Sequence, residues 1–223
     1  MVSTTRFTLV LAVAATLFAQ QRFDSVVRND FFAGFSGNRE ALDRGMKKCE
    51  EILAADSKQA EAMVWHGSGV FFRSGEAAKA GDYPTAAELY QRGLAEMDAA
   101  VALAPDNVAV VIPRGATLLT ASQGIPGDNG RELLKAGLAD YEKVYQLQKP
   151  YFDTLSGHAR GELLFGLAEG YLRLGDAARA RTWFEKLAAV NDPENSHLKQ
   201  ARAYLESGKL TGPATCAGCH AGK

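Results

Sequence analysis

The residues of this 223-residue chain whose types and spacing could do chemistry are gathered in one short run, Cys216-Ala-Gly-Cys219-His220. Two thiols three positions apart lie on the same side of a helical turn, because one turn takes 3.6 residues. Thiolates and imidazoles are ligands of transition metals, and two thiols can also form a disulfide. The run uses two of the three cysteines in the chain. Its composition therefore predicts metal-binding or redox chemistry in this segment.

The run resembles the C-x-x-C-H haem-attachment motif of c-type cytochromes, in these five residues and nowhere else in the chain. The resemblance implies one covalent haem c, with thioether bonds from Cys216 and Cys219 to its two vinyl groups. His220 would be the proximal ligand of the haem iron. Ala217 and Gly218 are small, which suits a backbone packed close against the edge of the ring.

Three other interpretations of the run stay open. A redox-active pair of cysteines usually begins a helix in a βαβ fold, and this sequence has no β pattern. A zinc site would need a fourth ligand beside Cys216, Cys219 and His220. The run could also be inert. The haem interpretation is favoured because the chain begins with an export signal, and haem is attached to such motifs outside the cytoplasm.

Residues 1–19 have the features of a secretory signal peptide. Arg6 supplies a positive charge, an apolar run extends from Phe7 to Phe18, and Ala19 is a small residue at the expected cleavage site. About 12 apolar residues are too few for a bilayer, which takes roughly 20. We therefore expect a periplasmic or otherwise exported protein without stable membrane insertion.

The charge balance excludes some partners. Lys and Arg number 25 against 26 Asp and Glu, which gives a net charge of −1. Such a balance gives no general affinity for nucleic acid or for anionic membranes. The sequence shows no Ser-His-Asp pattern, phosphate loop or carboxylate pair placed for acid–base catalysis. We therefore do not expect an enzyme.

The elements that position the motif are helices in residues 22–206, where Ala, Leu, Glu, Lys, Arg and Gln dominate and Pro is sparse. The clearest unit spans residues 164–187 and has two apolar stripes, each on one helical face, separated by a break at Gly175-Asp176. The first stripe consists of Leu164, Leu167, Ala168 and Tyr171. The second consists of Ala180, Phe184 and Leu187.

This unit resembles the tetratricopeptide repeat (TPR), in which two antiparallel helices cross on small residues. Ala168 and Ala180 would be the crossing residues here. The resemblance covers about 180 residues and implies an α-solenoid. It also implies a groove that binds a peptide or a partner protein.

Glycines upstream repeat this theme with a longer period. Gly45 and Gly93 are 48 residues apart, as are Gly67 and Gly115, and Gly137 follows Gly93 by 44 residues. TPR units repeat at roughly 34 residues. The longer period predicts longer helices or insertions between them.

The expected fold is thus all-α, a TPR-like solenoid of three to four helical hairpins. We expect one helix over Pro84–Leu103, an inserted loop over Gly124–Gly130, and a last helix over Ser196–Glu206 that caps the solenoid. Residues 207–223 form the third segment, a linker that carries the haem-attachment motif.

The remaining candidate residues are histidines and one cysteine. Cys49 and His66 lie in apolar stripes, and we expect both to be buried. We expect His158 and His197 at the surface. His197 is the nearest imidazole before the motif, and the linker could fold back to it. We therefore predict His197 as the sixth ligand of the haem iron.

These observations predict an exported monohaem c-type cytochrome on a TPR scaffold, acting in electron transfer and protein–protein interaction. Its partner would be a redox protein or a peptide in the solenoid groove, and the haem segment could mediate self-association. Two alternatives stay open. One is a ligand-binding or sensing protein with five-coordinate haem, and the other is a pure scaffold in which haem is structural or absent.

Overall fold

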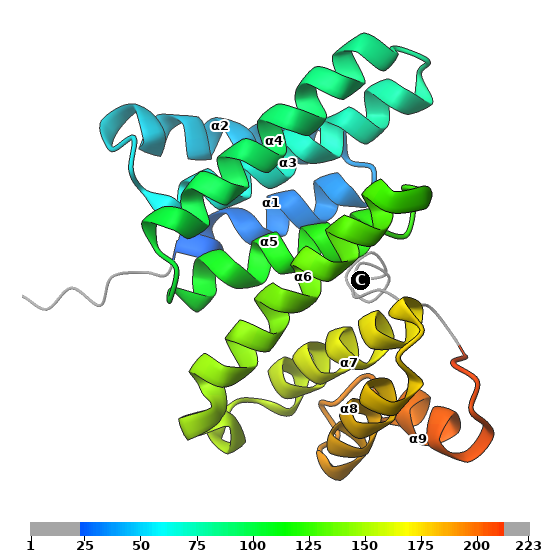
Figure 1. The fold of residues 1–223 in the computed structure, drawn as a ribbon. Helices are drawn as coiled ribbons and strands as arrows, with labels where there is room; N and C mark the ends of the chain where they lie inside the picture. Colours follow the sequence, from blue (N-terminus) through cyan, green and yellow to red (C-terminus); the bar gives the residue numbers. More distant parts are fainter. Residues whose placement is uncertain (1–22, 212–223) are drawn as a thin grey trace, which may run out of the picture.

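The computed structural model describes residues 23–211, and residues 1–22 and 212–223 lie outside the described range. Every regular element in that range is a helix, which confirms the all-α fold class (Figure 1). The helices are α1 (Phe23–Phe35), α2 (Arg39–Ala55), α3 (Ala60–Lys79), α4 (Tyr83–Leu103), α5 (Val108–Ala121), α6 (Gly127–Gln148), α7 (Gly157–Leu174), α8 (Ala177–Ala189) and α9 (Leu198–Ser207), with the short 3-10 helix η1 (Lys149–Thr154) after α6. Within the described range, no helix combines the length and the apolar character needed to cross a bilayer.

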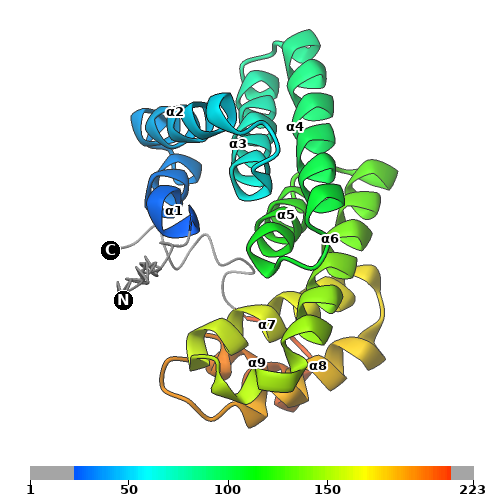
Figure 2. The same cartoon turned by 90° about the vertical axis from the view of Figure 1, so that its left-hand side faces the viewer.

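The helices pack as consecutive pairs, α1/α2, α3/α4, α5/α6 and α7/α8, with α9 against α8 (Figure 2). Neighbouring pairs are joined by contacts of α3 with α1, α2 and α5, and of α7 with α6 and α5. The described residues therefore form four hairpins and a terminal helix, in agreement with the expected solenoid-like arrangement.

Short polar residues define where the helices begin. Besides Gln59, the side chains of five shorter N-cap residues accept a hydrogen bond from a backbone N–H two or three residues further on, which stabilises each helix start by about 1 kcal/mol. These residues are Asn38, Asp82, Asn107, Ser156 and Asp176. Gly175 ends α7 in a left-handed conformation, with φ +84°, which favours glycine. The break predicted at Gly175-Asp176 is confirmed.

The recurring glycines lie where helices of a pair touch. A Cβ atom added at Gly93 of α4 would lie 2.6 Å from the backbone nitrogen of Phe71 and 2.8 Å from the carbonyl oxygen of Gly67, both on α3. A Cβ added at Gly137 of α6 would lie 3.0 Å from the carbonyl oxygen of Gly115 on α5. The long repeat period follows from long helices, since α3 has 20 residues and α4 has 21.

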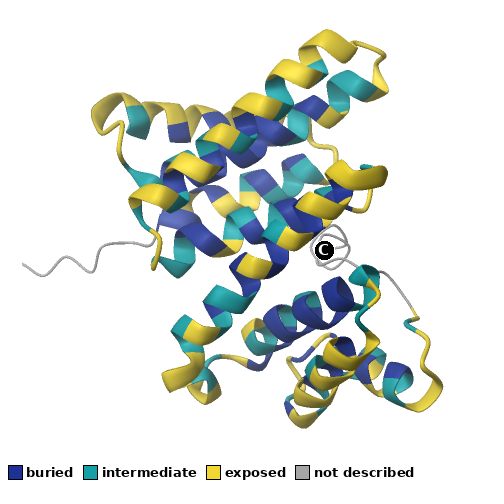
Figure 3. Ribbon diagram, viewed as in Figure 1, coloured by how far each residue is buried: buried dark blue, intermediate teal, exposed yellow. Residues whose placement is uncertain are grey.

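Buried hydrophobic side chains form two clusters. Figure 3 shows in dark blue where the buried residues lie along the helices. The N-terminal cluster contains Phe23, Val27, Phe31, Leu42, Met46, Cys49, Ala62, Val64, Trp65, Val70, Phe71, Met97, Ala100, Val110, Leu118 and Leu133. The C-terminal cluster contains Val111, Leu119, Leu134, Leu138, Tyr141, Val144, Leu163, Leu164, Phe165, Leu167, Ala168, Tyr171, Ala180, Phe184, Leu187, Val190, Ala201 and Tyr204.

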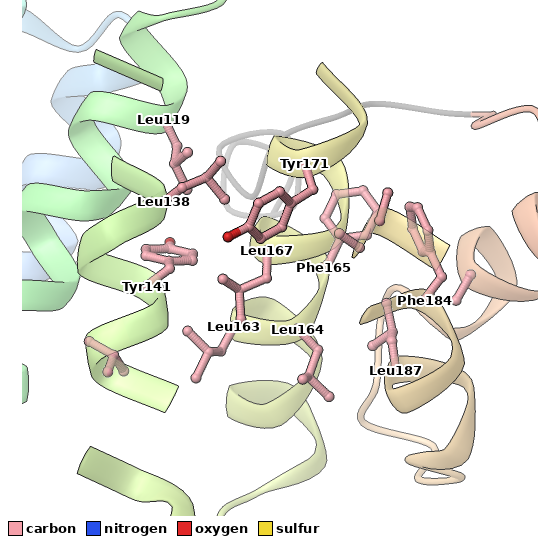
Figure 4. Packing of buried hydrophobic residues seen from close by; sticks show 14 of the residues in the cluster. Leu119, Leu138, Tyr141, Leu163, Leu164, Phe165, Leu167, Tyr171, Phe184 and Leu187 are labelled. Atoms are coloured by element: carbon pink, nitrogen blue, oxygen red, sulfur yellow. The ribbon is translucent and has the colours of Figure 1, made fainter. Parts of the chain in front are cut away.

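Helix α7 is the centre of the C-terminal cluster. Leu163 lies on its side toward Tyr141 of α6, and Phe165 lies toward Phe184 of α8 (Figure 4). Residues 163–165 and 167–171 of α7 are all buried. A helix that is apolar around most of its circumference is covered on several sides, and α7 is covered by α6, by α8 and by His197, which precedes α9.

The expected element boundaries hold except at one loop. The helices predicted over 84–103 and 196–206 are α4 and α9. The inserted loop predicted over 124–130 is too long, because α6 already begins at Gly127 with Pro126 as its N-cap. The error has a physical reason, since the first turn of a helix tolerates turn-forming residues and favours acidic ones such as Asp128.

Candidate functional site

The attachment residues Cys216, Cys219 and His220 lie outside the described residues, so the described part of the site is the scaffold from which their segment leaves. We call residues 207–223 the attachment segment. After α9, Gly208 takes a left-handed conformation with φ +69°. Leu210 then packs against the C-terminal cluster, and the Gln200 side-chain amide donates a hydrogen bond to the Thr211 carbonyl oxygen at 3.2 Å. The chain therefore turns back along α9 toward its N-terminal end.

His197 precedes α9 and is buried, with only 2% of its surface exposed. Its ring stacks on Phe165 of α7, with 3.9 Å between ring centroids and 8° between planes. Its Nδ1 lies 2.7 Å from Oε1 of Gln200, and its Nε2 lies 3.1 Å from Oε1 of Glu162. The predicted surface position of His197 is wrong, because the segment just before α9 packs against α7 and places the His197 ring on Phe165.

The hydrogen bonds of the two ring nitrogens, to Gln200 and Glu162, favour the charged form of His197. Gln200 donates from its amide nitrogen to Thr211, so its oxygen is the atom that faces His197. Both ring nitrogens then face acceptor oxygens, which only the doubly protonated ring satisfies. Burial lowers the pKa of His197, but hydrogen bonds to Glu162 and Gln200 outweigh burial, and the pKa is raised. The arrangement therefore favours the protonated form of His197.

An imidazolium has no lone pair to give to a metal. Iron ligation by His197 would require its hydrogen bonds to Gln200 and Glu162 to break. The sixth-ligand assignment made from the sequence stays a prediction.

The Glu162 carboxylate of α7 faces two histidines, His197 before α9 and His158 one turn earlier in α7. This carboxylate is 18% exposed and accepts from His197, and the Ser196 hydroxyl lies 3.4 Å from the same oxygen. His158, one turn earlier, places Nδ1 4.0 Å from that oxygen. The His158 side chain is 44% exposed, as expected for a surface position. Sequence analysis overlooked Glu162 and Gln200, although the i,i+4 spacing of Glu162 from His158 was a visible signal.

His66 and Cys49 are buried in the N-terminal half, as predicted. Nδ1 of His66 lies 2.7 Å from Glu96 and its Nε2 lies 3.5 Å from Glu50. Cys49 is a free cysteine, and burial raises its thiol pKa to about 12. A protonated, buried thiol is inert toward metals and oxidants.

Two arginines join the hairpins across buried polar sites. Arg114 of α5 contacts Asp140 of α6 at 3.3 Å. Arg173 of α7 donates to the Leu119 carbonyl oxygen at 3.1 Å and to Ser122 at 2.5 Å. Burial raises the pKa of Asp140 to about 6, although Arg114 acts in the opposite direction. These contacts connect α5, α6 and α7 and have a structural function.

Among residues 23–211, no group of three or more His, Cys, Asp and Glu side chains is placed to hold a metal ion. Comparisons with protein-family models, with curated proteins and with solved structures find no match to this chain. A functional assignment therefore depends on the motif itself and on the scaffold beside it.

Proposed function

We propose that the chain is an exported helical-repeat protein that carries one covalent haem c and transfers electrons to or from another protein. The observation that carries this proposal is the motif Cys216-Ala-Gly-Cys219-His220. Cys216 and Cys219 hold the haem through thioethers, and His220 binds the iron. When bound, haem supplies a one-electron couple.

The scaffold supports this proposal by restricting where the haem can lie. Leu210 and the Gln200–Thr211 hydrogen bond fix the start of the attachment segment on α9. Cys216 lies five residues beyond Thr211, and an extended chain of that length spans at most about 17 Å. A haem bound through Cys216 would therefore be attached within that distance of the end of the described chain. A TPR-like scaffold of four hairpins then offers the redox partner its docking surface.

Haem staining tests the attachment directly. The protein is produced in a host with haem-attachment machinery and separated on a denaturing gel, where only covalently bound haem is retained. We expect a stained band for the native protein and none for the Cys216→Ser, Cys219→Ser double variant. Cys49→Ser, which replaces the third cysteine, is the matched control and should stain fully. An unstained native protein, or a stained double variant, would contradict the proposal.

The visible spectrum distinguishes the remaining alternatives. Six-coordinate, low-spin haem with reversible one-electron reduction supports electron transfer. Five-coordinate, high-spin haem would favour ligand binding or sensing, and no haem band would leave a scaffold alone.

A further inference from the structure

A cleft opens where the first half of α6 meets the turn between α7 and α8. Its volume is about 720 Å³, within the range of small-molecule sites in proteins. The residues that line it are Arg131, Lys135, Leu174, Gly175, Asp176, Ala177, Ala178 and Arg179. We call this cavity the α6/α8 cleft.

The lining of the α6/α8 cleft carries an excess of positive charge. Arg131, Lys135 and Arg179 are cationic, and Asp176 is the one carboxylate among the lining residues. Asp176 is already engaged, because Nε of Arg179 donates to its Oδ2 at 2.6 Å. The remaining cations, Arg131 and Lys135, leave two positive charges without an opposite charge in the lining.

Both of these cations can turn toward a ligand at little cost. They lie one turn apart on α6, and both are exposed. Among residues 23–211, Arg131 forms no ion pair or hydrogen bond. Lys135 bonds to Glu132 at 2.6 Å, but the two side chains are 49% and 69% exposed, and such surface pairs contribute little to stability. An anion in the cleft can therefore replace Glu132 as the partner of Lys135.

A phosphate group matches this lining better than a carboxylate does. A phosphate monoester carries about −1.5 to −2 charge at neutral pH, which offsets the excess of two, whereas a carboxylate carries only one negative charge. A guanidinium such as that of Arg131 binds phosphate oxygens with two parallel hydrogen bonds. The N–H groups of Ala177 and Ala178, in the first turn of α8, also line the cleft and have no partner within their helix.

A second cavity of about 310 Å³ shares Arg131 with the α6/α8 cleft. It is lined by Ser122, Ile125, Gly127, Gly130, Arg131, Leu134 and Arg173. Arg173 pairs with Glu169 at 3.4 Å, so it adds no further excess charge. Ile125 and Leu134 supply apolar contacts. This cavity can therefore hold an uncharged organic group whose phosphate is bound at Arg131.

We propose that the α6/α8 cleft binds a small organic phosphate monoester. Arg131 and Lys135 bind the phosphate, and the second cavity receives the organic group. This inference goes beyond the proposed function, since it involves neither haem nor the attachment segment.

Calorimetric titration of the full-length protein tests the site with three probes. Phenyl phosphate carries both the phosphate and an organic group, inorganic phosphate lacks the ring, and benzoate keeps the ring but has one negative charge. We expect phenyl phosphate to bind at one site per chain, more tightly than inorganic phosphate and more tightly than benzoate.

Charge-removing variants locate the site. The double variant Arg131→Gln, Lys135→Gln should weaken binding of phenyl phosphate at least about tenfold, because hydrogen bonds to a charged group are lost at both positions. The matched control is Lys47→Gln, Lys48→Gln, which removes the same charge from exposed positions of α2 and should bind as the native protein does. Circular dichroism verifies that both variants retain their helices.

The contrary results differ in what they overturn. Failure of the native protein to bind phenyl phosphate, or an equal loss of binding in the two double variants, would overturn the site. Benzoate binding as tight as that of phenyl phosphate would overturn the assignment to phosphate. Inorganic phosphate binding as tight as that of phenyl phosphate would overturn the role of the second cavity. Each of these results leaves the proposed function standing, because haem staining tests it separately.

Discussion

The α3/α4 and α7/α8 hairpins cross in different ways. In α3/α4 the crossing residues are Gly67 and Gly93, and backbone touches backbone. In α7/α8 the residues predicted at the crossing are Ala168 and Ala180, which are both fully buried and carry a methyl group where glycine has a hydrogen. The first pair has helices of 20 and 21 residues, whereas α8 has only 13.

The difference distinguishes the N-terminal hairpins, whose long helices bury their side chains against one another, from the C-terminal region, which continues into the attachment segment. Long helices in close contact bury His66 and Met97 in the N-terminal cluster, out of reach of a ligand. The shorter α8 is followed by α9 and by the first residues of the attachment segment, and these pack on the C-terminal cluster. We infer that the N-terminal hairpins are structural and that the C-terminal region anchors the start of the attachment segment.

The largest expected effect is at the glycine crossing. Gly93→Ala should lower the free energy of unfolding by about 3 kcal/mol, because its Cβ would meet backbone atoms of α3 that cannot move separately. Gly75→Ala, in the partner helix α3, is the matched control. A Cβ at Gly75 meets no atom within 4 Å. The control should therefore stabilise the helix by up to about 1 kcal/mol. Equal stabilities of the two variants in denaturant unfolding would refute the close crossing.

The contact between α5 and α6 should make stability depend on pH. The pKa of Asp140 rises from 3.8 to about 6 on folding, so the folded protein binds more protons than the unfolded chain between these values. The free energy of unfolding should therefore fall as pH rises from about 4 to about 6. Asp140→Asn should flatten this slope in unfolding titrations at several pH values. An unchanged slope would mean that another group is responsible.

A smaller effect is expected at the alanine crossing. Ala180→Gly should cost about 1 kcal/mol of unfolding free energy, from added backbone entropy and a lost methyl contact. Comparing this loss of unfolding free energy with that of Gly93→Ala shows which pair of helices is in closer contact. If Ala180→Gly lost more unfolding free energy than Gly93→Ala, the α3/α4 contact would not be the more demanding of the two.

The smallest effect concerns His197. Its pKa is raised in the fold by Glu162 on α7 and by Gln200 on α9, so its contribution to stability is present below the unfolded pKa of about 6.5. That contribution is lost as pH rises through the folded pKa. His197→Gln should remove this pH dependence. Hydrogen exchange of the α9 amides is the measurement, and faster exchange of native α9 at low pH than at high pH, after correction for intrinsic rates, would contradict the assignment.

Local signals allowed much of the fold to be predicted. Gly175-Asp176 marked a helix break because one residue favours the left-handed conformation and the other caps a helix. The 48-residue spacing of glycines followed from the period of long hairpins. Both features depend on residues close in sequence or on a regular repeat.

The surroundings of His197 could not be predicted in the same way. His197 is buried because the residues just before α9 pack on α7, a tertiary contact that its own polar surroundings in the sequence do not indicate. The roles of Glu162 and Gln200 depend on the same contact, since each becomes relevant only when α7 and α9 lie together. The motif itself was recognised from its five residues, which lie outside the described part of the chain.

The intact mass of the mature protein tests the central claim most directly. The protein is purified from the exported fraction of a host that attaches haem, and its mass is measured under denaturing conditions. The account predicts the mass of a chain beginning near Gln20 plus one haem. A mass equal to the polypeptide alone, or a chain that retains Met1 and carries no haem, would contradict it.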